Sequence, residues 1–351
     1  MTKRERVFAA INHKNVDKIP KGELCIEGGL ANRLLSAHYP LDYQHFERDL
    51  EIRKLLDIDF INLGDWPSVY LGKDEKGFDR FWSNYRYEYE TNGINRHIVK
   101  PAISSPSDCA SYRKPDIGNV NGRIIKQFRE ESDLFVFGQI GGPVSMLDEM
   151  IPMEDFFVYC LTDTRDICVL AEKVLEYEVE KACLFIDNGA DAIIIADDIA
   201  YNTGAFLPPE VMKTLVYPNY IKMTKAIKSY KSVPVILHSD GDLRLIMDDI
   251  AVCGFDGLHS IQPSAGMDIA YIKEKWGKDL CLIGNIDLDY LMTRGSPNQV
   301  RTEVFRLLEL FGLNGGYMLS TCNTLIDAIP DENALAMYGA AEDYYNRRKG
   351  D

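Results

Sequence analysis

The sequence has no long apolar run, no paired cysteine motif and no excess of positive charge, and each absence excludes a class of protein. No apolar stretch approaches the roughly 18 to 20 residues of a membrane helix, so we expect no membrane segment. The eight cysteines form no Cys-x-x-Cys pair, and most lie in apolar stretches typical of core residues. Residues 1–14 read MTKRERVFAAINHK, an amphipathic pattern unlike a secretion signal, so we expect a cytoplasmic protein with reduced thiols.

The chain is acidic, with 54 Asp and Glu against 39 Lys and Arg and a net charge of −15 at pH 7. An acidic surface repels phosphate backbones, so we expect no nucleic-acid partner. It also disfavours a strongly anionic substrate unless a local basic group overrides the overall field. A surface charge that serves solubility alone fits the same composition.

Eight short apolar runs alternate with helical patterns along the chain. The predicted strands are Glu23–Ile26, Phe60–Leu63, Leu134–Phe137, Ala192–Ala196, Val233–Leu237, Gly257–Ile261, Leu280–Ile283 and Tyr317–Ser320. Continuous apolar runs are typical of strands buried on both faces of a parallel sheet. The alternation predicts one (β/α)₈ barrel domain over residues 1–351. The alternative is an open doubly wound sheet, which normally has a GxGxxG loop after its first strand, where this chain reads ELCIEGGL.

Three of the intervening helices have recognisable ends. Ser296 and Gln299 predict a capping box at the start of one helix. A second helix is predicted over residues 171–187, where apolar residues recur at helical spacing. A third begins at Pro208 and is expected to stop before Pro218, because proline cannot continue a helix interior.

A segment after the second predicted strand breaks this alternation. Residues 86–99 are predicted to form a β-hairpin with Asn92-Gly93 as a type I′ turn. Three tyrosines alternate onto one of its faces: Tyr85, Tyr87 and Tyr89. The insertion is interpreted either as a lid or partner surface, or as a plain structural flap.

Polar side chains follow all eight predicted strands, at the end where a (β/α)₈ barrel carries its active site. Loops that are merely capped would contain more Gly, Ser and Thr and fewer carboxylates, so this set favours a binding pocket rich in hydrogen-bond acceptors. Together with two residues of the loop after the fourth strand, the predicted substrate-binding residues are Glu27, Gln139, Tyr201, Asn202, Gln262, Asn285, Asp287 and Asn323.

The sharpest local pattern is His238-Ser239-Asp240 after the fifth strand. Residues i and i+2 of an extended segment point to the same side, so both His238 and Asp240 can face the pocket. With Cys322 arriving from the eighth strand, they offer three metal ligands and an open fourth position, which is typical of catalytic Zn²⁺ sites. A metal-free pocket in which His238 bonds to a carboxylate fits the same residues, and both interpretations stay open.

Asp197 and Asp198 are a second candidate pair. Adjacent residues of a strand end point to opposite sides, so one carboxylate should face the pocket and the other should anchor a loop. Two acids in a pocket raise the pKa of one of them, which suits a general acid, although loop capping explains either residue as well. Asp65, after the second strand, is a further candidate acid. His259 follows an apolar pair and is interpreted as structural.

Four segments resemble the uroporphyrinogen decarboxylase superfamily. They read ADAIIIADDIAYNTGAFLPPEVMKTLVYPNY, PVILHSDGDLRLIMDDIAVCGFDGLHSIQPSAGMD, LIGNIDLDYLMTRGSPNQV and GGYMLSTCNTLIDAIPDENALAMY. The similarity runs through most of the chain and is strongest from about Asp187 to Tyr338. The resemblance implies a (β/α)₈ fold, and the superfamily contains porphyrinogen decarboxylases and corrinoid-dependent methyltransferases.

The chemistry of the two branches differs. A decarboxylase of polycarboxylated tetrapyrroles needs cations near its mouth, and the family's Arg-rich motif follows the first strand. Here that stretch reads GELCIEGGLANRLL, with Glu27 in place of arginine and only Arg33 nearby. The zinc-dependent methyltransferases carry His-x-Cys after the fifth strand and Cys after the eighth, at the positions of His238, Asp240 and Cys322. The resemblance thus implies a Zn²⁺ site on these three residues, with a carboxylate replacing one thiolate.

The resemblance implies methyl transfer from a small methylated donor, best a methoxylated aromatic, to the Co(I) of a corrinoid on a partner protein. Zinc at an oxygen-rich site would assist an ether oxygen as leaving group, while Asp198 or Asp65 is an alternative proton source. The chain has no recognisable cobalamin motif, so the corrinoid protein is expected to dock over the barrel mouth. The alternatives are transfer from a methyl-corrinoid to a thiol, decarboxylation of a small acid, and a non-catalytic binding barrel. Pairing into a homodimer is also expected.

Overall fold

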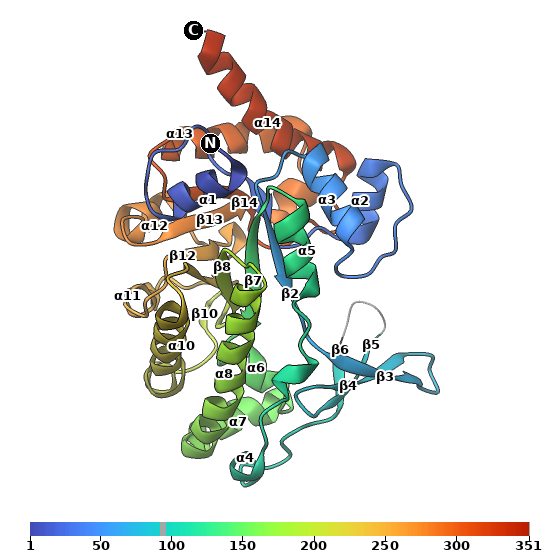
Figure 1. The fold of residues 1–351 in the computed structure, drawn as a ribbon. Coiled ribbons are helices and arrows are strands. Elements are labelled where there is room, and N and C mark those ends of the chain that lie inside the picture. The colour runs from blue at the N-terminus through green and yellow to red at the C-terminus, as the bar shows by residue number, and fades with distance from the viewer. Residues whose placement is uncertain (92–95, 351) are drawn as a thin grey trace.

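The computed structural model describes residues 1–91 and 96–350. Eight parallel strands form one sheet in the order β1-β2-β7-β8-β11-β12-β13-β14 (Figure 1). These strands are β1 Gly22–Glu23, β2 Phe60–Gly64, β7 Phe135–Gly141, β8 Ala192–Ala196, β11 Val235–Ser239, β12 Gly257–Ser260, β13 Cys281–Ile286 and β14 Tyr317–Thr321. Parallel bridges from Lys21 to Leu319 and from Ile26 to Leu325 bring the first strand against the last and close the barrel.

The eight strands lie at the eight apolar runs of the sequence, and the predicted (β/α)₈ barrel is confirmed. The first strand is shorter than predicted because the chain bends at Leu24. Strands β7, β11 and β13 end two to four residues later than predicted, so that His238 lies within β11. Gln139 and Asn285, which were expected to follow β7 and β13, therefore lie within them.

Helices pack around the sheet and fill the connections between its strands (Figure 1). They are α1 Lys3–Ile11, α2 Gly28–Leu35, α3 Phe46–Leu55, α4 Asp108–Ser111, α5 Arg123–Glu131, α6 Ser145–Asp148, α7 Met153–Thr162, α8 Thr164–Asp187, α9 Pro209–Val211, α10 Tyr217–Tyr230, α11 Met247–Ala251, α12 Ile269–Trp276, α13 Pro297–Phe311 and α14 Asp331–Gly350. Within the described part of the chain, no helix has both the length and the apolar character that crossing a membrane requires.

The predicted capping box of α13 is confirmed. The amide of Gln299 donates to the hydroxyl of Ser296, and the side chain of Gln299 accepts from the amide of Ser296. The predicted end of the third helix is wrong. After α9, a π-helical segment, Met212–Val216, leads directly into α10, which runs through Pro218. The π segment changes the hydrogen-bond register, so that Pro218 lies in the first turn of α10, where its missing N–H breaks no bond.

The interior of the barrel is filled with aromatic and aliphatic side chains at its N-terminal end. The rings of Phe60 and Phe137 lie 5.4 Å apart, and the ring of Phe8 from α1 lies 4.9 Å from that of Phe135. Helix α1 thus covers this end of the barrel, and its apolar residues belong to the same buried cluster. Because that end is packed shut, a pocket has to be built at the C-terminal ends of the strands.

The insertion after β2 is a four-stranded antiparallel sheet in the order β3-β4-β5-β6 (Figure 1). Its strands are β3 Ser68–Lys73, β4 Asp79–Ser83, β5 Glu88–Thr91 and β6 Arg96–Lys100. The predicted hairpin is the β5–β6 pair, and the predicted Asn92-Gly93 turn lies outside the described residues. The insertion is larger than predicted, because the turn at residues 74–77 that joins β3 to β4 was not recognised in the sequence.

The alternating tyrosines of the insertion face the body of the protein. Tyr85 and Tyr87 are both 1% exposed. The hydroxyl of Tyr85 donates to the carboxylate of Glu178 in α8, and that of Tyr87 donates to Glu149 over 2.7 Å. The tyrosine face predicted from the sequence is thus the face that fastens the insertion to the barrel.

Candidate active site

Three predicted residues converge beside the ends of β8 and β11. One ligand atom each from Asp198, His238 and Asp240 lies within 4.8 Å of the other two. The Nε2 atom of His238 is 3.8 Å from Oδ1 of Asp198, and the same oxygen accepts the amide of Asp240 over 2.9 Å. The i, i+2 spacing brings His238 and Asp240 to the same side, as the sequence predicted, and the neighbouring strand adds Asp198.

A second histidine orients the first. The two Nδ1 atoms of His238 and His259, which are opposite each other in the β11–β12 register, are 2.7 Å apart. Burial lowers the pKa of His259 well below its usual value, and His238 lowers it further, so His259 is neutral. A metal ligand at Nε2 of His238 requires that His238 donate its Nδ1–H to His259, and a neutral His259 can accept it. The histidine interpreted as structural is buried as expected and also positions His238.

Asp240 carries an unsatisfied buried oxygen. Its Oδ2 accepts the side-chain amide of Asn323 over 2.6 Å, whereas its Oδ1 is buried without a hydrogen-bond partner among the described residues. A buried carboxylate oxygen without a partner is costly, and a bound cation would satisfy it. The residues therefore fit a divalent metal, and one imidazole with two carboxylates is a ligand set that Zn²⁺ accepts.

Cys322, the third predicted ligand, is buried just after β14. It lines the same cavity as Asp240, but the group of close ligand atoms contains Asp198 instead of the thiol. Burial raises the pKa of Cys322 to about 12, and the charge of Asp240 adds to the shift. The thiol is thus protonated unless a cation lies next to it.

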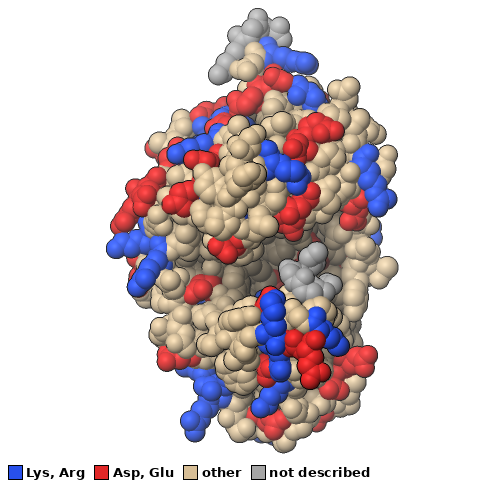
Figure 2. Space-filling view, turned by 90° about the vertical axis from the view of Figure 1, so that its right-hand side faces the viewer, with Lys and Arg blue, Asp and Glu red and all other residues tan. Residues whose placement is uncertain are grey.

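Two cavities adjoin the Asp198–His238–Asp240 group, each lined by different members of it. The smaller, about 300 Å³, is lined by Asp198 and His238 together with Trp66, Arg96, Gln139 and Glu149. The larger, about 580 Å³, is lined by Asp240 and Cys322 together with Gln262, Asp289, Arg294 and Asn323. The face that carries the insertion is hollowed, with acidic side chains at the border of the hollow (Figure 2). Three predicted substrate-binding residues, Gln139, Gln262 and Asn323, line these cavities.

Asp197 and Asp198 divide their roles in the way the sequence predicted. Asp197 is fully buried and accepts the amides of Val144 and Ser145 and the hydroxyl of Tyr220 at 2.6–2.9 Å, so it anchors the loop after β7. Desolvation raises the pKa of Asp197 to about 7 despite these hydrogen bonds. The side chain of Asp198 is 51% exposed and faces the cavity.

Several predicted residues hold the loops around the site. Asp287 caps the π-helical segment Leu288–Met292 by accepting the amides of Tyr290 and Leu291 at 2.9 and 2.8 Å. Glu27 accepts the amide of Asp327, and the buried side chain of Asn285 donates to a carbonyl in the loop after β12. These contacts fix the barrel rim, and none of the three residues lines either cavity or belongs to the ligand group.

Asp65, Tyr201 and Asn202 also lie away from the ligand group. The carboxylate of Asp65 accepts the amide of Asn121, and burial raises its pKa. Tyr201, in β9 Ala200–Tyr201, is 53% exposed and packs its ring 4.1 Å from that of Phe206. Asn202 lies in the exposed turn between β9 and β10 Gly204–Ala205.

Arg96 was missed by sequence reasoning. It comes from β6 of the insertion, pairs with Glu149 at 3.0 Å and lies 4.6 Å above the ring of Tyr89. The β5–β6 register pairs Tyr89 with Ile98, so Arg96, two residues away, is on the tyrosine face. The same period-2 alternation that revealed the tyrosines could therefore have found Arg96.

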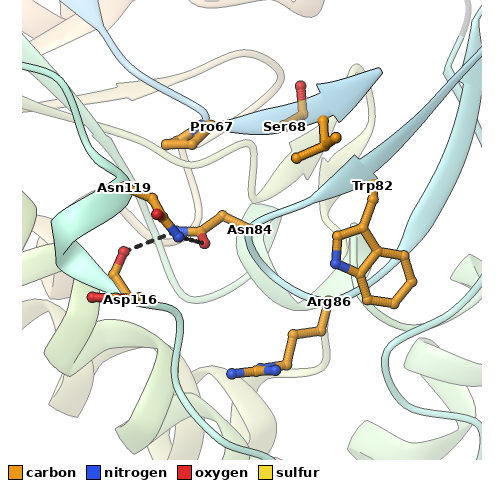
Figure 3. A pocket seen from close by; sticks show the side chains of 8 residues that line it. Pro67, Ser68, Trp82, Asn84, Arg86, Asp116 and Asn119 are labelled. Atoms are coloured by element: carbon orange, nitrogen blue, oxygen red, sulfur yellow. Dashed lines mark hydrogen bonds between the residues drawn. The ribbon is translucent and has the colours of Figure 1, made fainter. Parts of the chain in front are cut away.

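A further cavity of about 430 Å³ lies on the insertion (Figure 3). Trp82 and Arg86 line it on one side, while Asn84 and Asn119 are joined by a hydrogen bond on the other. The Nε of Arg86 donates to the carbonyl of Arg113. None of the metal-ligand candidates lines this cavity, so it is separate from the group at the barrel mouth.

The uroporphyrinogen decarboxylase (URO-D) family profile matches residues 85–344, which cover most of the barrel. The chain belongs to the URO-D family. A methylcobamide:CoM methyltransferase, MtaA, of Methanosarcina barkeri is 27% identical over 227 residues, which are 63% of this chain and 62% of that protein. A uroporphyrinogen decarboxylase of Chlorobium phaeovibrioides is 28% identical over 271 residues, 70% of each chain.

This URO-D family chain also shares its fold with a solved structure, a methyltransferase from Methanosarcina mazei. The two superpose with a TM-score of 0.78 over 98% of this chain and 99% of that one, at 21% identity. Proteins similar to this chain therefore include both decarboxylases and methyltransferases. The match spans less than two thirds of the length of the MtaA relative.

Proposed function

We propose that this URO-D family protein transfers a methyl group from a small methyl ether, a methoxylated aromatic in particular, to the Co(I) of a corrinoid carried by a partner protein. The observation that carries the proposal is the Asp198–His238–Asp240 group at the barrel mouth, with its unpartnered Asp240 oxygen. An oxygen-rich ligand set suits the departure of an oxygen leaving group. The names of the methyltransferase relatives support the reaction class.

Asp198, His238 and Asp240 would hold Zn²⁺, with Cys322 nearby in the same cavity. When bound, the metal supplies electrophilic stabilisation of the charge that develops on the leaving oxygen. The chain's own residues prepare this position. His259 holds the ring of His238, and the side-chain amide of Asn323 holds one oxygen of Asp240 over 2.6 Å.

The two cavities give the reactants separate places. The side-chain oxygen of Gln139, in the smaller cavity, accepts a hydrogen bond from the side-chain amide of Asn62. This contact leaves the amide group of Gln139 directed toward a reactant bound in the cavity. Gln262 in the larger cavity accepts the amide of Gly241 and so fixes the loop that presents Asp240. A corrinoid carried on a partner protein would approach from the open C-terminal face, beside the insertion.

The arginines beside the first strand are engaged within the protein, and buried Arg48 and Arg53 both donate to Asp49. Arg33, the arginine nearest to β1 in the sequence stretch that resembles the family motif, donates to Asp331 over 2.9 Å and to two carbonyls of the loop before α14. A cation engaged in this way holds the C-terminal helix to α2. The arrangement therefore favours methyl transfer over decarboxylation of a polycarboxylated tetrapyrrole.

A second candidate function runs the transfer from a methyl-corrinoid to a thiol. Its support is the activity for which two relatives are named, the MtaA protein and a methylated-thiol–coenzyme M methyltransferase of Methanosarcina mazei that is 23% identical over 254 residues. The carboxylates of Asp198 and Asp240 give the site hard oxygen ligands instead of soft thiolates. Such a site suits an oxygen leaving group better than a thiol, which favours the ether reaction.

Incubation with cob(I)alamin and a panel of methoxyarenes, methylamines and methyl thioethers tests the proposal. The expected result is methylcob(III)alamin, followed by absorbance, with methoxyarenes and with no other donor class. The second candidate would be selected if the protein demethylates methylcobalamin when a thiol is added and does not react with any ether. Release of CO₂ from a carboxylated substrate without methyl transfer would overturn both.

A further inference from the structure

The larger cavity contains a cation without a partner. Arg294 lines it together with Asp240 and Cys322, from the helical turn that continues the π-helical segment Leu288–Met292 just before α13. Among the residues whose side chains the structure describes, no ion pair and no hydrogen bond engages its guanidinium. Arginine offers five N–H donors in a fixed plane, so an unengaged guanidinium at a cavity wall is available to a ligand.

The arginine of the smaller cavity differs in this respect. Arg96 is 3.0 Å from the carboxylate of Glu149 and is stacked over Tyr89, so its charge is already compensated within the protein. Arg294 has no such compensation, although the chain as a whole carries a net charge of −15. Arg294 therefore brings an unpaired positive charge to a cavity that Asp240 and Asp289 also line, where a ligand anion can pair with it.

The larger cavity also has an apolar wall. Leu288, Ile326 and Ala328 line it between the polar groups. A ligand with an anionic group at one end and a short apolar body would contact Arg294 and this wall together. Its far end would then lie in the part of the cavity that Asp240 and Cys322 line.

We infer that Arg294 binds the anionic oxygen group of the small substrate, which makes that substrate a carboxylate, sulfonate or phosphate. The planar guanidinium fork matches these groups in a bidentate manner. The anion site follows from the cavity alone, while the identity of the reacting methyl end rests on the proposed function. Arg294 is thus a specificity-determining residue that distinguishes charged from neutral donors.

Calorimetric titration tests the anion site without any methyl transfer. The probes are benzoate, benzenesulfonate and phenyl phosphate, with neutral benzamide as their uncharged match. We expect at least one anion to bind the wild type about tenfold or more tightly than Arg294→Gln, a difference typical of one charged contact, and benzamide to bind both alike. The anion with the largest difference identifies the group that the site prefers.

Two further variants complete this experiment. Arg306→Gln removes the same charge from α13, where Arg306 is paired with Glu303 at 2.6 Å, and should leave anion binding unchanged. Arg294→Lys keeps the charge without the fork and should bind the anions with intermediate affinity, which also covers the case in which Arg294→Gln fails to fold. Equal anion affinity in wild type, Arg294→Gln and Arg294→Lys would overturn the inference.

Kinetics with two matched donors connect Arg294 to the reaction. With cob(I)alamin as acceptor, Arg294→Gln should raise the KM for 4-methoxybenzoate about tenfold or more and leave kcat and the constants for 4-methoxybenzamide nearly unchanged. An equal loss with both donors would show a structural role and contradict the inference. If the wild type methylates cobalamin from neither donor, the proposed function fails, and the calorimetric comparison still decides the role of Arg294.

Discussion

The Oδ1 atom of Asp240 is an unsatisfied polar atom of the candidate site. It is buried without a hydrogen bond among the described residues, while Oδ2 of the same carboxylate has a short contact to Asn323. Native proteins keep few such atoms, and those they keep commonly await a ligand or ion. At the residue scale, the Asp198–His238–Asp240 group is therefore best tested through metal binding.

Replacing Asp240 with asparagine should weaken Zn²⁺ binding by more than about 100-fold. A direct ligand is lost, and even changes outside the ligand shell typically cost roughly 10- to 100-fold in metal affinity. Competition with a chelator of known zinc affinity measures the change. Asp289→Asn is the matched control, because Asp289 lines the same cavity outside the ligand group. Equal affinities in Asp240→Asn and wild type would remove Asp240 from the site.

Replacing His259 with leucine should weaken Zn²⁺ binding by about 10- to 100-fold without removing a ligand, because the 2.7 Å contact that orients His238 disappears. His259→Gln retains a side-chain acceptor and should restore part of the affinity. The same chelator competition gives the values, with melting curves to verify folding. A leucine variant that folds and binds zinc as tightly as wild type would show that His259 only fills space.

The sequence predicted His238 and Asp240 correctly as neighbours, because the period of two in an extended segment is a local property. The close approach of Asp198 instead of Cys322 depends on how β8, β11 and β14 are staggered around the barrel. No local pattern encodes that stagger. For the same reason, the sequence did not single out Arg294, because Asp240, Gln262 and Cys322 reach its cavity from other connections of the barrel.

At the scale of elements, the insertion is held to the barrel by a buried charged network. Lys181 and Glu178, both in α8, are fully buried and lie 2.8 Å apart. Lys181 is also 3.1 Å from the hydroxyl of Tyr85, and Glu178 accepts the amide of Gly141 over 2.7 Å. The network joins α8, β7 and the insertion, so its loss should affect all three.

Replacing Lys181 with methionine should destabilise the fold by about 3–5 kcal/mol, because Glu178 would remain buried as an unpaired charge. Adding Glu178→Gln should recover part of this loss, since the uncompensated charge is then removed. Urea unfolding followed by circular dichroism gives both free energies. A loss below about 1 kcal/mol in the single variant would mean that water reaches Glu178 and that the network contributes little.

The helix that runs through Pro218 shows where element boundaries exceed the reach of sequence patterns. Proline normally ends a helix, and the prediction followed that rule. The π-helical segment Met212–Val216 inserts a wider turn just before Pro218 and lets the helical path continue. A π turn has no reliable sequence signal, whereas the capping box at Ser296 has a strong one and was predicted correctly.

At the scale of the whole molecule, one carboxylate joins the first strand of the barrel to the last strand and the C-terminal helix. Glu23 of β1 is fully buried and accepts hydrogen bonds from Ser320 and Thr321 of β14 and from Tyr338 of α14. Burial raises its pKa from 4.5 to about 7, because these bonds offset the desolvation only in part. Closure of the barrel is therefore linked to pH.

Glu23 should make the protein less stable as the pH rises from about 4.5 to about 7. In this range the folded state holds a proton that the unfolded state has released, and above pH 7 neither state holds it. The difference between the pKa of Glu23 in the unfolded and folded states corresponds to about 3 kcal/mol of unfolding free energy. Glu23→Gln should not show this pH dependence of stability. Urea unfolding of both proteins at pH 5 and pH 8 measures it. Parallel pH dependences would mean that Glu23 titrates normally.

The barrel as a whole was accessible from the sequence, because eight buried strands leave eight apolar runs with helices between them. The size of the insertion was underestimated, since the turn at residues 74–77 between β3 and β4 was overlooked and β3 carries exposed residues such as Val69 and Tyr70. The division of the barrel mouth into two cavities follows from loop packing, which composition and periodicity do not determine.

Those two cavities also bear on the order of events in the proposed methyl transfer. Because Asp198 and His238 face one cavity and Asp240 faces the other, two reactants can be present at the same time without competing for space. A double-displacement scheme would require a protein nucleophile that carries the methyl group, and two separate cavities make such a carrier unnecessary. Initial-rate plots with both substrates varied should therefore intersect, as for a sequential mechanism, and parallel lines would point to a methylated enzyme.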